Sequence, residues 1–141
     1  MNYFSLALTA LCGMVVYFAY GFLLVALVPD LIKENRKYRS VFRPKEKIMS
    51  LMPAGMAATF VAILVAAILF AMMRQGGSGL VGGALFGALL GLFVVCGFVV
   101  HNYVNLNIGL KLALLQAVAY FVQWTITGIV IGLIYKPLAT P

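Results

Sequence analysis

Four long runs of apolar residues, separated by short polar segments, dominate the chain. The runs extend over approximately residues 3–28, 48–73, 79–100 and 112–135. A helix needs about 20 consecutive, mostly apolar residues to cross the hydrocarbon of a bilayer, and each run meets this length. Alternating segments of about 10 residues, which are typical of a membrane β-barrel, do not occur. The pattern therefore predicts an all-α integral membrane protein: a four-helix bundle in which residues 1–141 form a single transmembrane domain.

Composition supports this prediction. Hydrophobic residues make up 65% of the 141 residues, charged residues make up 9%, and the mean hydropathy is +1.10. A water-soluble domain of this length could not bury so much apolar surface inside itself. No basic residue precedes the first run, and the run is longer than the apolar core of a signal peptide. We therefore expect it to remain as the first helix.

One segment carries most of the charge. Residues 30–47, DLIKENRKYRSVFRPKEK, hold seven of the ten basic residues and all three acidic ones. Basic loops are retained on the cytoplasmic side, so this segment predicts a cytoplasmic loop and places both termini on the extracytoplasmic side. The turn at 74–78 then lies outside, and Lys111 enters the fourth run from the inside. The expected location is the cell membrane, specifically a bacterial inner membrane, with several crossings.

Two interpretations of this basic segment are open. In the first, it forms a helix in the membrane interface, with four side chains on one apolar face: Leu31, Tyr38, Val41 and Phe42. Five basic side chains would then contact anionic lipid: Lys33, Arg36, Lys37, Arg39 and Arg43. Each contributes about 1 kcal/mol near an anionic surface. In the second, the segment is a solvated topology signal only. Nucleic-acid binding is not expected, because the net charge of +7 arises from one juxtamembrane loop.

Glycines recur at intervals of four along the third run. They form one row, and the fourth run holds a pair with the same spacing: Gly79, Gly83, Gly87 and Gly91, then Gly128 and Gly132. Lipid tails are as apolar as leucine, so membrane helices associate through close backbone packing, and small residues mark these contacts. The row therefore predicts a glycine zipper. Its partner is either a helix of the same chain, or a second copy or another membrane protein.

The second run offers a matching row of small residues. Its alanines have the same four-residue spacing: Ala54, Ala58, Ala62 and Ala66. Only about five residues separate this run from the third, and short connections favour antiparallel neighbours. We therefore expect the second and third helices to pack together through these two rows.

A polar stripe interrupts the fourth run. Four of its side chains are spaced four, three and four residues apart, with a tryptophan beside them: Gln116, Tyr120, Gln123 and Thr127, then Trp124. An amide that faces lipid near the bilayer midplane costs several kcal/mol, so we expect this face to turn into the bundle. Thr9, Tyr17 and Thr59 are the expected partners. Either these groups join helices through hydrogen bonds, or they line a ligand pocket or hydrated path.

The sequence predicts no catalytic residue, metal or cofactor. No Asp or Glu lies within a run, which argues against a transporter that couples to protons or cations through an intramembrane carboxylate. Cys12 and Cys96 lie in different runs, and His101 is the sole histidine, so no set of metal ligands is expected. We expect His101 to be hydrogen-bonded at the interface. The alternative is ligation of a haem or a chlorophyll magnesium.

Four motifs occur in a distinctive order: YFAYG closes the first run, GALFGALLG opens the third, HNYVNLN follows it, and QW lies in the last helix. In this order the chain resembles a family of small, uncharacterised bacterial four-span membrane proteins that share a domain of unknown function. The resemblance covers most of the chain. Because the family has no assigned activity, it implies a fold and a membrane location, but no site residues.

Two functions of different classes are consistent with the sequence. The first is a non-enzymatic small membrane protein, an accessory or assembly subunit or a self-oligomer, whose basic loop contacts lipid. Its expected partners are membrane lipids, and itself or another membrane protein, but no nucleic acid. The second is a carrier or channel for a small neutral or anionic solute, lined by the polar stripe. An enzyme is not expected, because paired titratable groups are missing from the apolar runs.

Overall fold

The computed structural model describes residues 2–73 and 79–136, and within these ranges it is all-helical. The segments are α1 (Tyr3–Leu27), α2 (Pro29–Lys37), α3 (Lys45–Met73), α4 (Leu80–Val94), the π-helical η1 (Val95–Val100), α5 (His101–Asn105) and α6 (Leu110–Ile134). Because α4, η1 and α5 are continuous, four helices are long and apolar enough to cross a membrane. The prediction of an all-α, multi-pass membrane protein is confirmed. The predicted outside turn at 74–78 and the tail at 137–141 lie outside the described residues.

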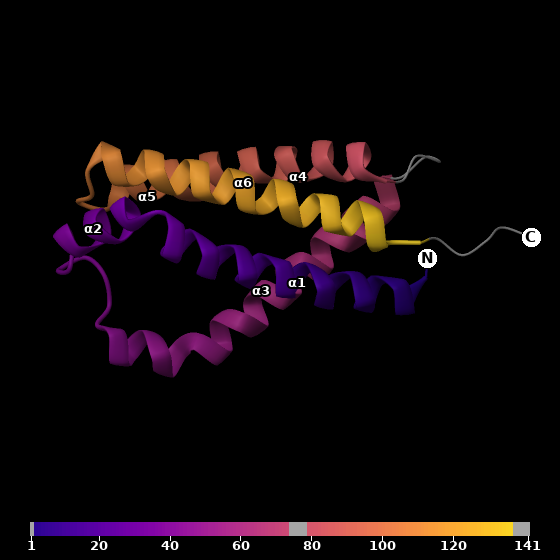
Figure 1. The fold of residues 1–141 in the computed structure, drawn as a ribbon, viewed down its shortest axis with the longest axis horizontal. Coiled ribbons are helices and arrows are strands. Elements are labelled where there is room, and N and C mark those ends of the chain that lie inside the picture. Colours follow the sequence, from indigo (N-terminus) through magenta and orange to yellow (C-terminus); the bar gives the residue numbers. More distant parts are fainter. Residues whose placement is uncertain (1, 74–78, 137–141) are drawn as a thin grey trace, which may run out of the picture.

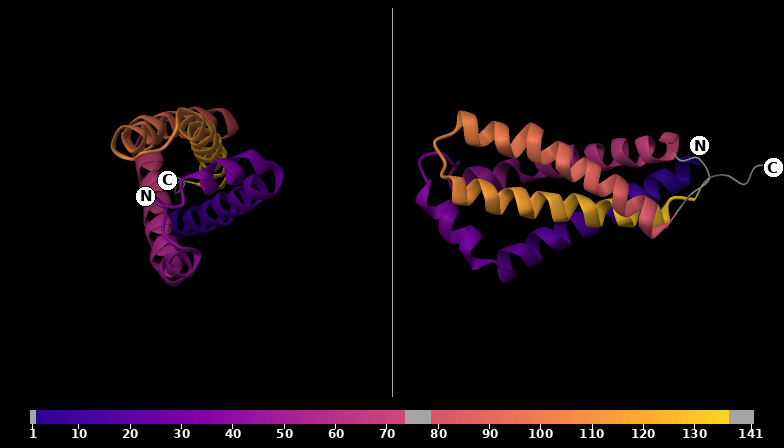
Figure 2. Two further views of the ribbon diagram at one scale, coloured as in Figure 1. Left: turned by 90° about the vertical axis from the view of Figure 1, so that its left-hand side faces the viewer. Right: turned by 90° about the horizontal axis from the view of Figure 1, so that it is seen from above.

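Helix α6 lies at the centre of the arrangement. Helix α4 packs along one side of it and α1 along another, and α1 in turn contacts α3 (Figures 1 and 2). The short helix α2 packs on α6 at one end of the molecule, which we call the α2 end. At the opposite end, the backbone amide of Lys136 donates to Ser5 Oγ at 2.8 Å. This hydrogen bond joins the C-terminal end of α6 to the first turn of α1.

Local sequence determines where α1 begins and ends. Asn2 caps its first turn, because the Oδ1 atom accepts a hydrogen bond of 3.1 Å from the Ser5 amide. Pro29 has no amide hydrogen and disfavours a helical conformation at the residue before it, so α1 stops before Val28. The same proline suits the first turn of a new helix, and α2 begins there. The chain thus turns at the α2 end without a long loop.

The glycine row of α4 packs on α6, within one chain. A Cβ atom on Gly87 would lie within 2.9 Å of three α6 backbone atoms, and one on Gly91 would lie 2.9 Å from the Phe121 carbonyl oxygen. Gly83 meets the backbone of Gly128 and Gly132 with similar closeness, and the Gly79 amide donates to the Gly132 carbonyl at 3.2 Å. The row therefore contacts a helix of the same chain, which is the first of the two partners that the sequence left open. Glycine faces glycine across this contact, so the two backbones approach more closely than alanine would allow.

The expected pairing of α3 with the glycine row is wrong. Helix α3 packs mainly on α1, and Ala54, Ala58 and Ala62 are exposed, whereas Ala66 is buried in the core. The core fills the half of the molecule away from the α2 end and includes Leu6, Ala10, Ile63, Ala67, Phe70, Phe86 and Ile131. A short connection constrains only the adjoining ends of two helices. Accordingly, α3 and α4 meet there through the rings of Phe70 and Phe86, whose centroids lie 5.3 Å apart.

The first half of α3 diverges from the other helices. All residues from 45 to 58 are exposed, and the helix bends in this region (Figure 1). Pro53 lies inside the helix and removes one backbone hydrogen bond, which is a common cause of such bends. The packed core therefore occupies one end of the molecule, while the α2 end is open between α3 and the remaining helices.

Candidate functional site

The polar stripe of α6 faces α1. Gln123 is 8% exposed, and its Nε2 atom donates a hydrogen bond of 2.9 Å to the carbonyl oxygen of Tyr17. Thr127 is fully buried, and its hydroxyl donates to the Gln123 carbonyl at 2.8 Å. The stripe thus turns into the bundle, as predicted, and one amide joins two helices. The partner is the backbone of Tyr17 rather than its side chain.

The other two expected partners lie elsewhere. Thr9 is fully buried in α1, and its hydroxyl has no hydrogen-bond partner among the described residues. Thr59 Oγ1 donates to the Gly55 carbonyl within α3 at 2.9 Å. Neither threonine therefore bonds to the stripe.

Aromatic packing fills the space beyond Gln123. The rings of Tyr17 and Trp124 meet edge to face, with centroids 5.8 Å apart and an interplanar angle of 69°. Both rings also pack against the core. Trp124 therefore fills space within the bundle. Together with the Gln123–Tyr17 hydrogen bond, this contact separates the open α2 end from the packed end.

Three stripe residues line a cavity on the α2 side of this contact. This inner pocket, about 320 Å³ in volume, lies between α1, α2 and α6. Its lining comprises Tyr17, Phe18, Gly21, Leu24, Leu31, Asn35, Gln116, Ala119, Tyr120 and Gln123. Thr127 and Trp124 are not part of this lining, so the predicted stripe divides into a pocket wall and a packing contact.

A larger and strongly basic cavity adjoins the inner pocket. This basic pocket, about 850 Å³ in volume, lies between α2, the start of α3 and α6. Its lining comprises Ile32, Asn35, Arg36, Arg39, Phe42, Arg43, Pro44, Lys45, Ile48 and Gln116. Asn35 and Gln116 line both cavities. The two cavities are therefore neighbours along the same side of α6.

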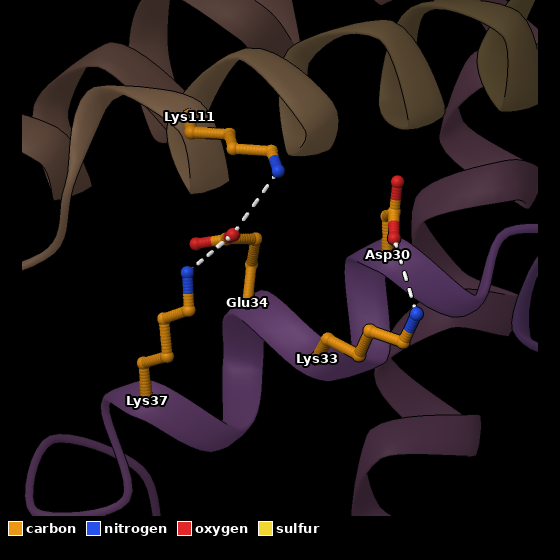
Figure 3. Close-up of polar contacts among 5 residues, drawn as sticks. All are labelled: Asp30, Lys33, Glu34, Lys37 and Lys111. Carbon is orange, nitrogen blue, oxygen red and sulfur yellow. Dashed lines mark hydrogen bonds and ion pairs between the residues drawn. The ribbon is translucent and has the colours of Figure 1, made fainter.

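Among the residues that the structure describes, the basic side chains of this pocket have no acidic partner. Figure 3 shows the ion pairs of the segment: Lys33 with Asp30 at 3.6 Å, and both Lys37 and Lys111 with Glu34 at 2.7 and 3.2 Å. Within residues 2–73 and 79–136, no carboxylate pairs with the four cations of the basic pocket: Arg36, Arg39, Arg43 and Lys45. The basic pocket therefore has an excess of positive charge.

Glu34 attaches α2 to the bundle. Its side chain is only 5% exposed and lies between Lys37 of α2 and Lys111 of α6 (Figure 3). The hydrogen bond from Lys37, and then the one from Lys111, hold the pKa of Glu34 below its usual range. The same contact raises the pKa of Lys37. The carboxylate thus stays ionised near neutral pH and links two helices.

Apolar packing supports the same attachment. Leu31, Ile108 and Leu112 form a small buried cluster, against which Tyr38, Val41 and Phe42 pack. The four residues that the sequence places on one apolar face therefore belong to one cluster: Leu31, Tyr38, Val41 and Phe42. One detail was wrong, because the helix ends at Lys37 rather than continuing past Phe42. The apolar side packs on the bundle. The segment is not wholly solvated, since Leu31 and Glu34 are buried, but its basic side chains are exposed, and their role as a topology signal stays a prediction.

Only some of the five predicted lipid-contacting side chains meet in one place. Arg36, Arg39 and Arg43 line the basic pocket, whereas Lys33 and Lys37 do not line it and are paired with carboxylates. Sequence analysis did not predict the role of Glu34. The available signal was its spacing: Glu34 follows Leu31 by three residues and so lies on the same helical face.

The remaining candidate residues do not cluster. His101 is exposed at the start of α5, where its carbonyl oxygen accepts a hydrogen bond of 2.8 Å from Asn105 Nδ2. Cys12 and Cys96 are free thiols. The described part of the chain contains no group of three His, Cys, Asp or Glu side chains placed to hold a metal ion.

Comparison with known proteins gave no match to a family model, to a curated protein or to a solved structure.

Proposed function

We propose that the protein is a non-enzymatic integral membrane protein that binds the head group of an anionic lipid in its basic pocket. The observation that carries this proposal is the gathering of Arg36, Arg39, Arg43 and Lys45 around one cavity without a carboxylate partner among the described residues. An anion bound there would balance this charge. Guanidinium groups are well suited to the task, because they form paired hydrogen bonds with phosphate oxygens.

The rest of the pocket lining supports a lipid rather than a simple anion. Ile32, Phe42 and Ile48 provide apolar surface beside the four cations. Basic pockets near the ends of membrane helices favour anionic head groups, and each Lys or Arg near an anionic surface contributes about 1 kcal/mol. A lipid head group with the start of its chains would contact both kinds of surface.

The proposed orientation places the α2 end in the cytoplasm and both termini outside, in the cell membrane of a bacterium. It is supported by the seven basic residues of 30–47 and by Lys111, which lies at the same end through its contact with Glu34. The anionic surface of the cytoplasmic leaflet would then lie next to the basic pocket.

A carrier for a small neutral or anionic solute is the second candidate. It is favoured by the inner pocket, where Gln116, Tyr120 and Gln123 provide polar groups between α1 and α6. Its difficulty is the packing of Tyr17, Trp124 and the core beyond this pocket. Transport would require α1 and α6 to separate at the Gln123–Tyr17 hydrogen bond. Lipid binding requires no such rearrangement, so it is the preferred function.

A role as an accessory or assembly subunit stays a prediction. The glycine row contacts α6 within the chain, so it no longer argues for contact between copies.

Lipids retained by purified variants test the proposal. In the double variant Arg39→Gln/Arg43→Gln, two cations of the basic pocket are removed. The control Lys33→Gln/Lys47→Gln removes the same charge from side chains outside the pocket lining. After extraction in mild detergent, mass spectrometry of bound lipids should show loss of anionic phospholipid from the first variant only. Equal retention by both variants would exclude the basic pocket as the binding site.

A further inference from the structure

A third cavity extends from the basic pocket along α3. This groove, about 340 Å³ in volume, lies between α1 and the first half of α3. Its lining comprises Phe18, Arg43, Ile48, Leu51, Met52, Gly55, Met56 and Thr59. Arg43 and Ile48 line both the groove and the basic pocket. The strongly charged cavity therefore continues into a mainly apolar one.

The wall of the groove on α3 has no protein partner within the described residues. All side chains of residues 45–58 are exposed, including Leu51 at 41%, Met52 at 44% and Met56 at 40%. In a membrane-spanning helix such residues contact acyl chains. Methionine side chains are flexible and polarizable, so they adapt to a chain without a fixed shape.

We propose that this groove holds an acyl chain of the same anionic lipid whose head group binds in the basic pocket. The inference rests on the proposed function and specifies its ligand: one phospholipid molecule bound in a formed site, rather than a general attraction to an anionic surface. Arg43 lines both cavities, so a phosphate at their junction would contact its guanidinium group. The apolar groove then takes one chain from that junction toward the bilayer centre.

The length of the groove agrees with this assignment. Ile48 and Thr59 are separated by eleven positions, which corresponds to about 16 Å along a helix. Half of the hydrocarbon core of a bilayer is about 15 Å thick. The stretch of α3 that lines the groove is therefore about as long as one leaflet is deep. A soluble anion would need the basic pocket alone and no apolar extension.

Gly55 offers a way to block the groove without disturbing the protein. A Cβ atom on Gly55 would have no atom within 4 Å, so a large side chain there can enter the groove without a clash at its base. Gly97 is a matched control, because a Cβ atom there would also meet nothing within 4 Å, and Gly97 does not line the groove. We therefore compare Gly55→Trp with Gly97→Trp.

The experiment uses phosphatidylglycerol with a photoactivatable group in its acyl chain, in liposomes that contain the full-length protein. After irradiation, the crosslinked peptides are identified by mass spectrometry. Wild type and Gly97→Trp should crosslink within residues 48–59. Gly55→Trp should lose most of these crosslinks, at least fivefold, while its content of helix is unchanged by circular dichroism.

Several outcomes would overturn the inference. Unchanged crosslinking in Gly55→Trp would place the acyl chain elsewhere. Binding of glycerol phosphate as tightly as the full lipid would indicate a site for a free anion only. Crosslinks between two copies of the chain through residues 48–59 would show that a second copy fills the groove. In each of these cases, loss of anionic lipid from Arg39→Gln/Arg43→Gln would still support head-group binding in the basic pocket. Only the assignment of the groove to an acyl chain would then be wrong.

Discussion

Gln123 on α6 donates a hydrogen bond of 2.9 Å to the carbonyl oxygen of Tyr17 on α1. This bond satisfies a side-chain amide at a depth where lipid offers no partner. It also lies at the boundary between the two halves of the molecule, because Gln123 and Tyr17 line the inner pocket on one side while Tyr17 packs with Trp124 on the other. The polar stripe therefore contributes both to helix association and to the wall of a cavity.

Replacement of Gln123 by leucine should weaken the contact between α1 and α6. Hydrogen bonds between membrane helices contribute about 0.6 to 2 kcal/mol, so we expect a loss of this size in the free energy of unfolding. The control is Gln116→Leu, because Gln116 has no side-chain hydrogen bond within the described residues but lines the same inner pocket. Unfolding in mixed detergent micelles measures both changes. Equal losses in the two variants would contradict the role of this bond.

Replacement of Gly87 by leucine should separate α4 from α6. The new side chain would meet three backbone atoms of α6 within 2.9 Å of its first carbon, and backbone cannot move aside as a flexible side chain can. Overpacking of this kind costs about 1 to 3 kcal/mol, and occasionally more. Gly55→Leu is the matched control, since its position is open. Thermal unfolding in detergent should show a clear loss for Gly87→Leu alone. Wild-type stability of Gly87→Leu would refute the zipper.

Replacement of Glu34 by glutamine should release α2 from the bundle. The change removes the carboxylate that lies between Lys37 and Lys111, and leaves both ammonium groups without their partner. Hydrogen exchange in residues 29–37 should increase. The control is Asp30→Asn, because the Asp30–Lys33 pair is largely exposed and such pairs contribute little. Slow exchange in both variants would mean that apolar packing by Leu31 is sufficient to hold α2.

The attachment of α2 should also depend on pH at the acid extreme. The pKa of Glu34 is lowered from its ordinary value of 4.5, chiefly by the hydrogen bond from Lys37. Because the attached state lowers the pKa of this carboxyl group, it is stabilised at pH values above the ordinary pKa of 4.5. This stabilisation is lost as the pH falls through the lowered pKa. The protection factors of the α2 amides, which compare the observed exchange rate with the intrinsic rate at the same pH, should therefore be constant from neutral pH to about pH 5 and then fall below pH 4.5. A fall that begins near neutral pH would show that another group controls the attachment.

Sequence predicted the helices well, because the length of an apolar run relates directly to membrane thickness. It did not predict the full extent of the third span, which continues through η1 and α5 to Asn105. Polar residues of HNYVN indicate a turn when only hydropathy is considered. In the structure, the side-chain amide of Asn105 donates a hydrogen bond to the His101 carbonyl oxygen within the helix. The polar residues therefore extend the helix instead of ending it.

Sequence could not identify which helices pack together. The four-residue spacing of Gly83 and Gly87 shows that a helix approaches closely, but several helices carry small residues at the same spacing. The partner depends on the tilt of each helix and on the bend in α3, which are properties of the whole assembly. The basic pocket was predictable only in part for the same reason. The arginines could be identified, but their position beside Gln116 depends on how α2 packs on α6.

The most direct test of the account is the relative affinity of the wild-type protein for anionic and zwitterionic lipid. Native mass spectrometry, with phosphatidylglycerol and phosphatidylcholine of identical chains titrated in turn, gives the two dissociation constants. At about 1 kcal/mol for each basic side chain, we predict at least tenfold tighter binding of phosphatidylglycerol, which corresponds to about 1.4 kcal/mol. Equal dissociation constants for the two lipids would contradict the proposal that the basic pocket binds an anionic head group.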